Sequence, residues 1–183
     1  IEKLKCTIVI EAQKKIVYND EFIKIKEDTP NAKLKSITIN KFNSQDITFA
    51  FSLDLPEFNT VNKISYINKK NINKGCDGII FLLRNNNLFI LLCELKSDKP
   101  HKRDFENQLK SSEAFVYYLL KIISIFDDIQ IPEKQVIFKR LLFDTRINKN
   151  TTHMKNQKYS IYRIGCDEGD KNTFPIKKLL DIS

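Results

Sequence analysis

The most apolar part of the chain consists of two short segments, residues 78–84 (GIIFLLR) and 88–95 (LFILLCEL), separated by asparagines. Both segments are apolar at consecutive positions, which is typical of strands that are covered on both faces. Asn85, Asn86 and Asn87 favour a tight turn, because asparagine tolerates positive φ angles. The pattern therefore predicts a β-hairpin in the interior of a sheet.

Two segments before this hairpin alternate between apolar and polar residues. They are residues 36–42 (SITINKF) and 46–54 (DITFAFSLD), and each has the length of a strand. The residues between them, 43–45 (NSQ), favour a turn. We therefore expect these two segments to pair with each other as a second hairpin.

The flanking segments are less regular. Residues 6–10 (CTIVI) resemble a strand, whereas residues 11–25 are compatible with a helix. Residues 135–143 (QVIFKRLLF) and 159–164 (YSIYRI) predict two further strands, and residues 174–182 (FPIKKLLDI) indicate a short helix.

After residue 104 the apolar period changes from two to three or four, which predicts an amphipathic helix. Asp104 is the expected N-cap. The expected inward-facing positions are Phe105, Leu109, Ser112, Val116, Leu119 or Leu120, and Ile123. A strand, a helix and a strand in succession imply a parallel crossover. The expected fold class is therefore α/β (α+β), with a central mixed β-sheet flanked by helices.

The chain has 183 residues, of which 42% are hydrophobic and 30% are charged. This composition predicts a single domain, 1–183, with a core at about 36–145 and N- and C-terminal elaborations at 1–35 and 146–183. No apolar stretch is long enough to span a bilayer, and the charged start of the sequence does not resemble a secretion signal. The four cysteines form no C-x-x-C pair, as expected for free thiols in a reducing compartment. We therefore expect a cytoplasmic protein without a membrane partner.

The formal net charge of +8 favours a polyanionic partner such as nucleic acid. Residues 61–76 contain four lysines and no acidic residue, and a second basic group precedes the predicted helix. Either group could be a solvated loop or a rim that binds phosphates. The candidate phosphate-binding residues are Lys69, Lys70, Lys74, Lys99, Lys102 and Arg103.

Three charged residues stand at the ends of the apolar hairpin. If Asn85 and Asn86 form a two-residue turn, Asp77 lies opposite Glu94, on the same face of the sheet. Lys96 follows Glu94 by two positions and points the same way. A three-residue turn would instead move Asp77 to the other face. The register of this turn decides whether the three charges converge.

Two converging carboxylates repel each other and are costly to desolvate, and one lysine offsets only part of that cost. A Mg²⁺ ion would offset more, since it takes one or two carboxylates together with water and phosphate oxygens. The ammonium of Lys96 would then hold a water or neutralise charge on a phosphorane-like transition state. The alternative interpretation is a surface cluster of ion pairs, which contributes little.

The spacing D-x(16)-E-L-K, formed by Asp77, Glu94 and Lys96 at the ends of a hairpin that a helix follows, resembles the PD-(D/E)XK nuclease superfamily. The resemblance covers residues 46 to 143 as an arrangement, and Cys76 stands where the family has proline. It implies a restriction-endonuclease-like fold and cleavage of phosphodiester bonds that depends on Mg²⁺ or Mn²⁺. Asp77 and Glu94 would be metal ligands, and Lys96 would position the attacking water.

The same resemblance implies a contribution from the following helix, where Gln108 resembles the Q-L-x-x-x motif of some branches of the family. It also implies a glutamate from an N-terminal helix, for which Glu11 and Glu21 are both candidates. The expected function is a metal-dependent endonuclease of restriction, repair or defence type, acting on DNA rather than RNA. A non-catalytic nucleic-acid-binding module and a protein-interaction domain are the alternatives. A homodimer is compatible with the apolar helix at 115–126, although core packing explains that segment equally well.

Overall fold

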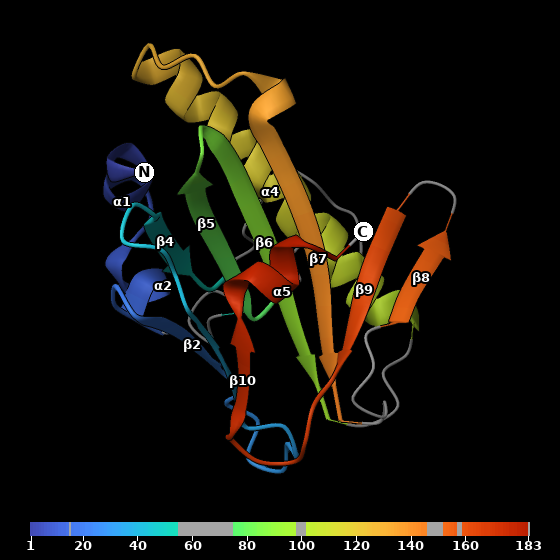
Figure 1. Ribbon diagram of the computed structural model, residues 1–183. Coiled ribbons are helices and arrows are strands. Elements are labelled where there is room, and N and C mark those ends of the chain that lie inside the picture. Colours follow the sequence, from blue (N-terminus) through green and yellow to red (C-terminus); the bar gives the residue numbers. More distant parts are fainter. Residues whose placement is uncertain (15, 55–74, 98–101, 146–151, 157–158, 183) are drawn as a thin grey trace.

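The structure is a computed structural model that describes residues 1–14, 16–54, 75–97, 102–145, 152–156 and 159–182 (Figure 1). It is a mixed α+β fold, as the strand and helix patterns predicted, and it has two β-sheets where one central sheet was expected. The larger sheet has six strands in the order β4-β5-β6-β7-β9-β8. Their bounds are β4 Ile47–Phe51, β5 Gly78–Arg84, β6 Asn87–Lys96, β7 Val136–Asp144, β8 Thr152–Asn156 and β9 Tyr159–Gly165.

The smaller sheet joins segments from both ends of the chain. Its order is β1-β2-β3-β10, and β10 runs parallel to β3. The bounds are β1 Val17–Tyr18, β2 Phe22–Lys26, β3 Ser36–Asn40 and β10 Asn172–Pro175. Four α-helices are described, α1 Glu2–Thr7, α2 Ile10–Lys14, α4 Lys102–Phe126 and α5 Ile176–Leu180, together with a 3₁₀ turn at Glu133–Gln135.

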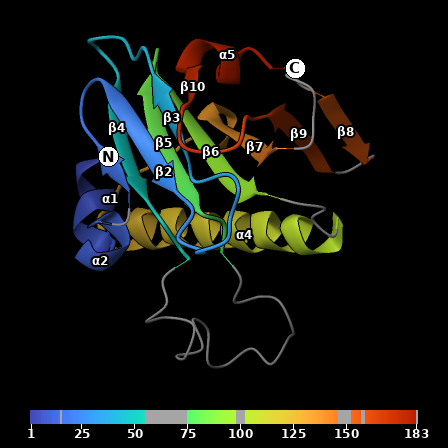
Figure 2. The same cartoon turned by 90° about the horizontal axis from the view of Figure 1, so that it is seen from below.

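The elements form three layers, with α4 on one face of the six-stranded sheet and the smaller sheet on the other (Figure 2). Side chains of β5 alternate between the two resulting cores. Ile79 and Phe81 pack on the α4 side, and Ile80 and Leu82 pack on the side of the smaller sheet. The central hairpin is therefore covered on both faces, as its apolar pattern predicted.

The hairpin between β5 and β6 has a two-residue turn. Arg84 pairs with Asn87, and Gly78 pairs with Cys93, in one continuous antiparallel register. Asn85 and Asn86 have φ angles of 50° and 62°, which is the backbone of a type I′ turn. The three-residue alternative, which would have separated Asp77 from Glu94, is therefore wrong.

Helix α4 contains the predicted amphipathic stripe. Phe105, Leu109, Ser112, Val116, Leu119, Leu120 and Ile123 are all buried. The helix begins at Lys102, so Asp104 lies in its first turn and is not the N-cap that we expected. The strand that follows, β7, is parallel to β6, which confirms the predicted crossover.

The predicted pairing of residues 36–42 with residues 46–54 is wrong. Both segments are strands, but β3 lies in the smaller sheet and β4 pairs with β5 in the larger one. The physical reason is burial: β4 packs Phe49 on the α4 side and Ala50 on the opposite side, so it needs cover on both faces. The connecting segment crosses between the layers instead of folding back on itself.

The N-terminal prediction is also wrong in part. Residues 6–10 are no strand, because Leu4, Ile8 and Ala12 recur at helical spacing and pack in the α4-side core. Residues 22–26, which overlap the end of the segment 11–25 that was compatible with a helix, form β2 with Ile23 and Ile25 buried between the sheets. The C-terminal helix is confirmed as α5, whereas β10 was not predicted.

Within the described residues, none of the helices combines the length and hydrophobicity required to cross a membrane.

Candidate active site

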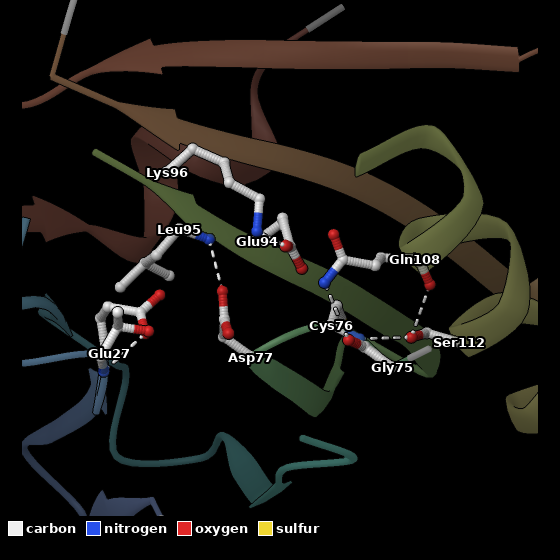
Figure 3. A network of polar contacts seen from close by, with 10 residues as sticks. Glu27, Gly75, Cys76, Asp77, Glu94, Leu95, Lys96, Gln108 and Ser112 are labelled. Carbon is white, nitrogen blue, oxygen red and sulfur yellow. Dashed lines mark hydrogen bonds and ion pairs between the residues drawn. The ribbon is translucent and has the colours of Figure 1, made fainter. Parts of the chain in front are cut away.

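Asp77, Glu94 and Lys96 converge at the end of the hairpin that is remote from the Asn85–Asn86 turn (Figure 3). Side chains of β6 alternate, so that Leu92 packs on the α4 side and Leu91 packs on the other. Glu94 and Lys96 continue the alternation of Leu92 and lie on the α4 side. One further step in the register from the Gly78–Cys93 pair brings Asp77 opposite Glu94.

Glu94 is the most deeply enclosed of the three charged residues, with 0% of its surface exposed. Its Oε1 forms an ion pair with the Nζ of Lys96, whose side chain is 27% exposed. Its Oε2 is buried and has no hydrogen-bond partner in the described part of the chain. An ion pair therefore satisfies one oxygen of this carboxylate, and the other has no partner among the described residues.

Asp77 is 5% exposed, and its Oδ2 accepts a hydrogen bond from the backbone amide of Leu95 at 2.6 Å. Burial raises the pKa of Asp77 to about 7, although Lys96 and the Leu95 amide act in the opposite direction. Burial also raises the pKa of Glu94 well above its usual range, and the charge of Asp77 adds to that rise. These shifts show how poorly the surroundings tolerate two ionised carboxylates.

Lys96 responds in the opposite sense. Burial by itself lowers the pKa of this ammonium, but the charges of Glu94 and Asp77 outweigh burial and raise the pKa. Lys96 therefore stays protonated at neutral pH. The burial of both carboxylates is inconsistent with the alternative of a surface cluster of ion pairs.

Helix α4 holds the segment that leads into Asp77. The Oγ of Ser112 accepts a hydrogen bond from the Cys76 amide at 2.8 Å and donates one to the Gln108 carbonyl at 2.9 Å. The Nε2 of Gln108 donates to the Gly75 carbonyl at 3.4 Å. Figure 3 shows the Gln108 side chain beside Glu94. The structure thus brings Gln108 to the site, where its side chain donates a hydrogen bond to the backbone.

Two glycines stand near Asp77 where neighbouring segments of the chain approach closely. A Cβ atom on Gly78 would lie 2.5 Å from Cδ1 of Ile25 in the smaller sheet. A Cβ atom on Gly75 would lie 2.3 Å from Cβ of Leu53. Both positions therefore require glycine for close packing of the chain.

Two acidic residues near the site were not identified from the sequence. The charges of Glu27 and Asp54 both raise the pKa of Asp77, and Glu27 follows the end of β2. The expected candidates lie elsewhere, since Glu21 precedes the other end of β2 and Glu11 is exposed on α2. The alternating FIKIK segment could have indicated a strand that ends just before Glu27.

The structure describes few of the candidate phosphate-binding residues. Arg103 is exposed in the first turn of α4, and Lys102 begins that helix. The remaining candidates lie outside the described residues, namely Lys69, Lys70, Lys74 and Lys99.

The donor set of the site fits Mg²⁺ or Mn²⁺. Across the described residues, no group of three or more His, Cys, Asp or Glu side chains is arranged to hold a metal ion. Mg²⁺ typically takes only one or two carboxylates, however, and keeps several waters. Asp77 and Glu94 provide two hard oxygen donors, and the unpartnered Oε2 of Glu94 is the atom that such an ion would satisfy.

Comparisons with known proteins give no assignment. No protein-family model matches the chain, and neither the curated proteins nor the solved structures include a significant match. The function is therefore argued from the geometry of the site.

Proposed function

We propose that the protein is a metal-dependent nuclease that hydrolyses phosphodiester bonds in DNA, as an endonuclease of the PD-(D/E)XK type. The observation that carries the proposal is the pair of buried carboxylates, Asp77 and Glu94, facing each other beside the ammonium of Lys96. The order of a hairpin with these residues at its ends, followed by α4 and a parallel strand, agrees with the arrangement that the resemblance implies.

The energetics of the site support a functional role. When both carboxylates are ionised, the three groups carry a net charge of −1 in a largely dry environment, which is unfavourable by several kcal/mol. If apolar residues stood at these three positions, they would continue the apolar pattern of both strands and the cost would not arise. Ionisable groups with strongly shifted pKa values cluster at catalytic sites for this reason.

Asp77 and Glu94 are the residues that would hold the metal ion. When bound, Mg²⁺ or Mn²⁺ would supply Lewis acidity toward the scissile phosphate. The Leu95 amide orients the carboxylate of Asp77, and the Lys96 ammonium orients that of Glu94. Protonated Lys96 would donate a hydrogen bond to the attacking water or stabilise negative charge that develops on the phosphate. The apolar residues of the β5–β6 hairpin pack next to Asp77, Glu94 and Lys96 and limit the access of water to them.

The test is a cleavage assay with plasmid, linear duplex, single-stranded DNA, branched DNA and RNA, each with Mg²⁺, Mn²⁺ or EDTA. We expect cleavage that requires the metal and is lost in Glu94→Ala and in Lys96→Ala. Asp127→Ala is the control, because it removes a carboxylate that is ion-paired with Lys3 outside the site. Cleavage that persists in EDTA, or in both site variants, contradicts the proposal.

Calorimetry separates a nuclease from a non-catalytic nucleic-acid-binding module. We expect Mn²⁺ to bind the wild-type protein and to bind Glu94→Ala much more weakly, with Asp127→Ala unchanged. DNA binding that depends on salt, without a Mn²⁺ signal, would favour the binding module.

We further propose that the protein acts in the cytoplasm. All four cysteines are free, with Cys6 exposed and Cys76, Cys93 and Cys166 buried. Free thiols of this kind are typical of a reducing compartment. Fractionation of cells that produce the protein tests this location. We expect the protein in the cytoplasmic fraction, and export to an oxidising compartment would contradict the proposal.

A further inference from the structure

The charged residues at the site continue across the sheet onto β7 and β9. Glu94 pairs in register with Leu142, and Leu142 pairs with Arg163. Lys96 pairs with Asp144 at the end of β7. Leu142 packs in the α4-side core, so residues paired with it point to the face that carries Glu94. Arg163 and Asp144 therefore extend the polar end of this face beyond Lys96.

These two residues form an ion pair that is largely buried. Asp144 is 0% exposed, and its Oδ2 accepts a hydrogen bond from Nη2 of Arg163. The Arg163 side chain is 23% exposed, and its Nε is buried without a hydrogen-bond partner in the described structure. A buried guanidinium with an unused donor is unfavourable, because that donor has lost its water.

The other arginine–carboxylate pairs of the described residues are built differently. Arg84 binds Asp46 through both Nε and Nη2, and Arg140 binds Glu113 through the same two groups. Both are fork-like bidentate pairs, the usual way in which arginine is held for stability. Arg163 contacts its carboxylate through Nη2, and its Nε makes no such second bond. The carboxylate thus holds the guanidinium through Nη2, and the partly exposed side chain can meet a further acceptor.

We propose that Arg163 binds a backbone phosphate of the DNA substrate beside the scissile bond, while Asp144 holds the guanidinium in position. This inference rests on the proposed nuclease function and adds a substrate-binding residue to its site. Neighbouring strands lie about 4.8 Å apart, so the backbone of Arg163 is roughly 10 Å from that of Glu94, two strands away. That separation is within reach of one substrate strand lying across the sheet end. Arginine suits the role because its planar fork matches the oxygens of a phosphate.

The experiment uses charge-neutral double variants, because loss of one cation from a basic protein weakens DNA binding at any position. Arg163→Gln with Asp144→Asn removes the pair without changing the net charge and leaves no buried carboxylate unpaired. Arg84→Gln with Asp46→Asn is the matched control, since that pair lies at the opposite end of the sheet. Both doubles are made in the Glu94→Ala background, and binding of a short fluorescein-labelled DNA duplex is followed by anisotropy over about 50–200 mM salt. Thermal unfolding checks that each variant is folded.

We expect the Arg163 double to bind at least about 10-fold more weakly than the Glu94→Ala parent, with a salt slope smaller by about one. The Arg84 double should bind within about twofold of the parent. Arg163→Lys, which keeps the charge and the Asp144 partner, should restore only part of the affinity. Equal affinities and slopes for the two doubles would overturn the role of Arg163. If the wild-type protein still cleaves DNA in that case, the nuclease proposal stands; if the wild type neither binds nor cleaves DNA, both fail.

Discussion

The carboxylate of Asp77 accepts a hydrogen bond from the amide of Leu95, the residue that separates Glu94 from Lys96. This bond ties the entry of β5 to the end of β6, because each strand contributes one partner. It fixes the orientation of Asp77 relative to the two charged residues beside Leu95. The site is therefore held by the backbone of the hairpin as well as by its ion pair.

Asp77 should make the stability of the metal-free protein depend on pH. Its pKa is about 7 in the folded protein and about 3.9 when unfolded, so the folded state binds the additional proton. The associated stability is complete below about pH 4 and is lost as the pH rises towards 7, by on the order of 4 kcal/mol. Urea unfolding in EDTA across this range should show the decline, and Asp77→Asn should make it smaller, with the remainder due to Glu94, whose pKa burial also raises. A wild-type profile that rises with pH, or that Asp77→Asn leaves unchanged, would contradict the assignment.

Mg²⁺ should oppose this decline, because a metal ion binds the deprotonated carboxylates. We expect added Mg²⁺ to raise the unfolding temperature clearly at about pH 8 and little at about pH 5, since binding to the folded state stabilises by mass action. Differential scanning fluorimetry measures the shift, with Glu94→Gln as the control that should lose it. An equal shift in that variant would place the ion elsewhere.

Lys96 and Glu94 should be coupled in stability. Lys96→Met leaves Glu94 buried without its cation and should destabilise the metal-free protein by about 3–5 kcal/mol at neutral pH. The double variant with Glu94→Gln removes both charges and should recover most of that loss. Chemical denaturation of the four proteins in the cycle gives the coupling energy. Independent, additive effects would mean that the ion pair is not what holds these groups.

Local signals allowed much of the site to be predicted. The side-chain period of two predicted Asp77 opposite Glu94 for a two-residue turn, and the structure decided the turn length that the asparagines had left open. The period of three to four was sufficient to identify the buried face of α4, including Ser112. Both features depend on residues close in sequence, whose geometry leaves few alternatives.

The parts that were not predicted depend on contacts between distant segments. The alternation of β3 and β4 is the same in any sheet, so it does not reveal that these strands lie in different layers. The parallel pairing of β10 with β3 joins segments more than a hundred residues apart. Glu27 lies near Asp77 because β2 packs across the central sheet. The residues around Glu27 in the sequence do not indicate this packing between distant segments.

The glycines beside Asp77 should differ in how far substitution can be relieved. Gly78→Ala brings a Cβ against the outer methyl of Ile25, and we expect a loss of about 1–3 kcal/mol. Ile25→Val removes that methyl, so the double variant should be more stable than the sum of the two single effects predicts. Urea unfolding of the cycle measures the interaction. Strict additivity would show that Ile25 is not the obstacle.

Gly75→Ala should be the more damaging change. Its Cβ would meet the Cβ of Leu53 at 2.3 Å and the Leu53 backbone at 3.1 Å, and neither atom can turn away. We expect a larger loss of stability than for Gly78→Ala, with no rescue by Leu53→Val, because valine keeps the Cβ. Gly169 is not a suitable control, since its φ of 97° adds strain of a different kind. Equal losses at the two positions would mean that the backbone at Gly75 shifts to make room.

Ser112 should act as a positioning residue for Asp77. Ser112→Ala leaves the buried amide of Cys76 without its acceptor, which should destabilise the protein by about 1–3 kcal/mol. Release of the segment before Asp77 should also weaken Mn²⁺ binding, measured by calorimetry at a temperature where the variant remains folded. Ser124→Ala, at a half-buried serine further along α4, is the matched control and should change neither quantity appreciably. Ser112→Thr keeps the hydroxyl, so it should retain more metal affinity than Ser112→Ala even though the added methyl strains the packing. A Ser112→Ala protein with lowered stability and unchanged Mn²⁺ affinity would reduce Ser112 to a structural contact.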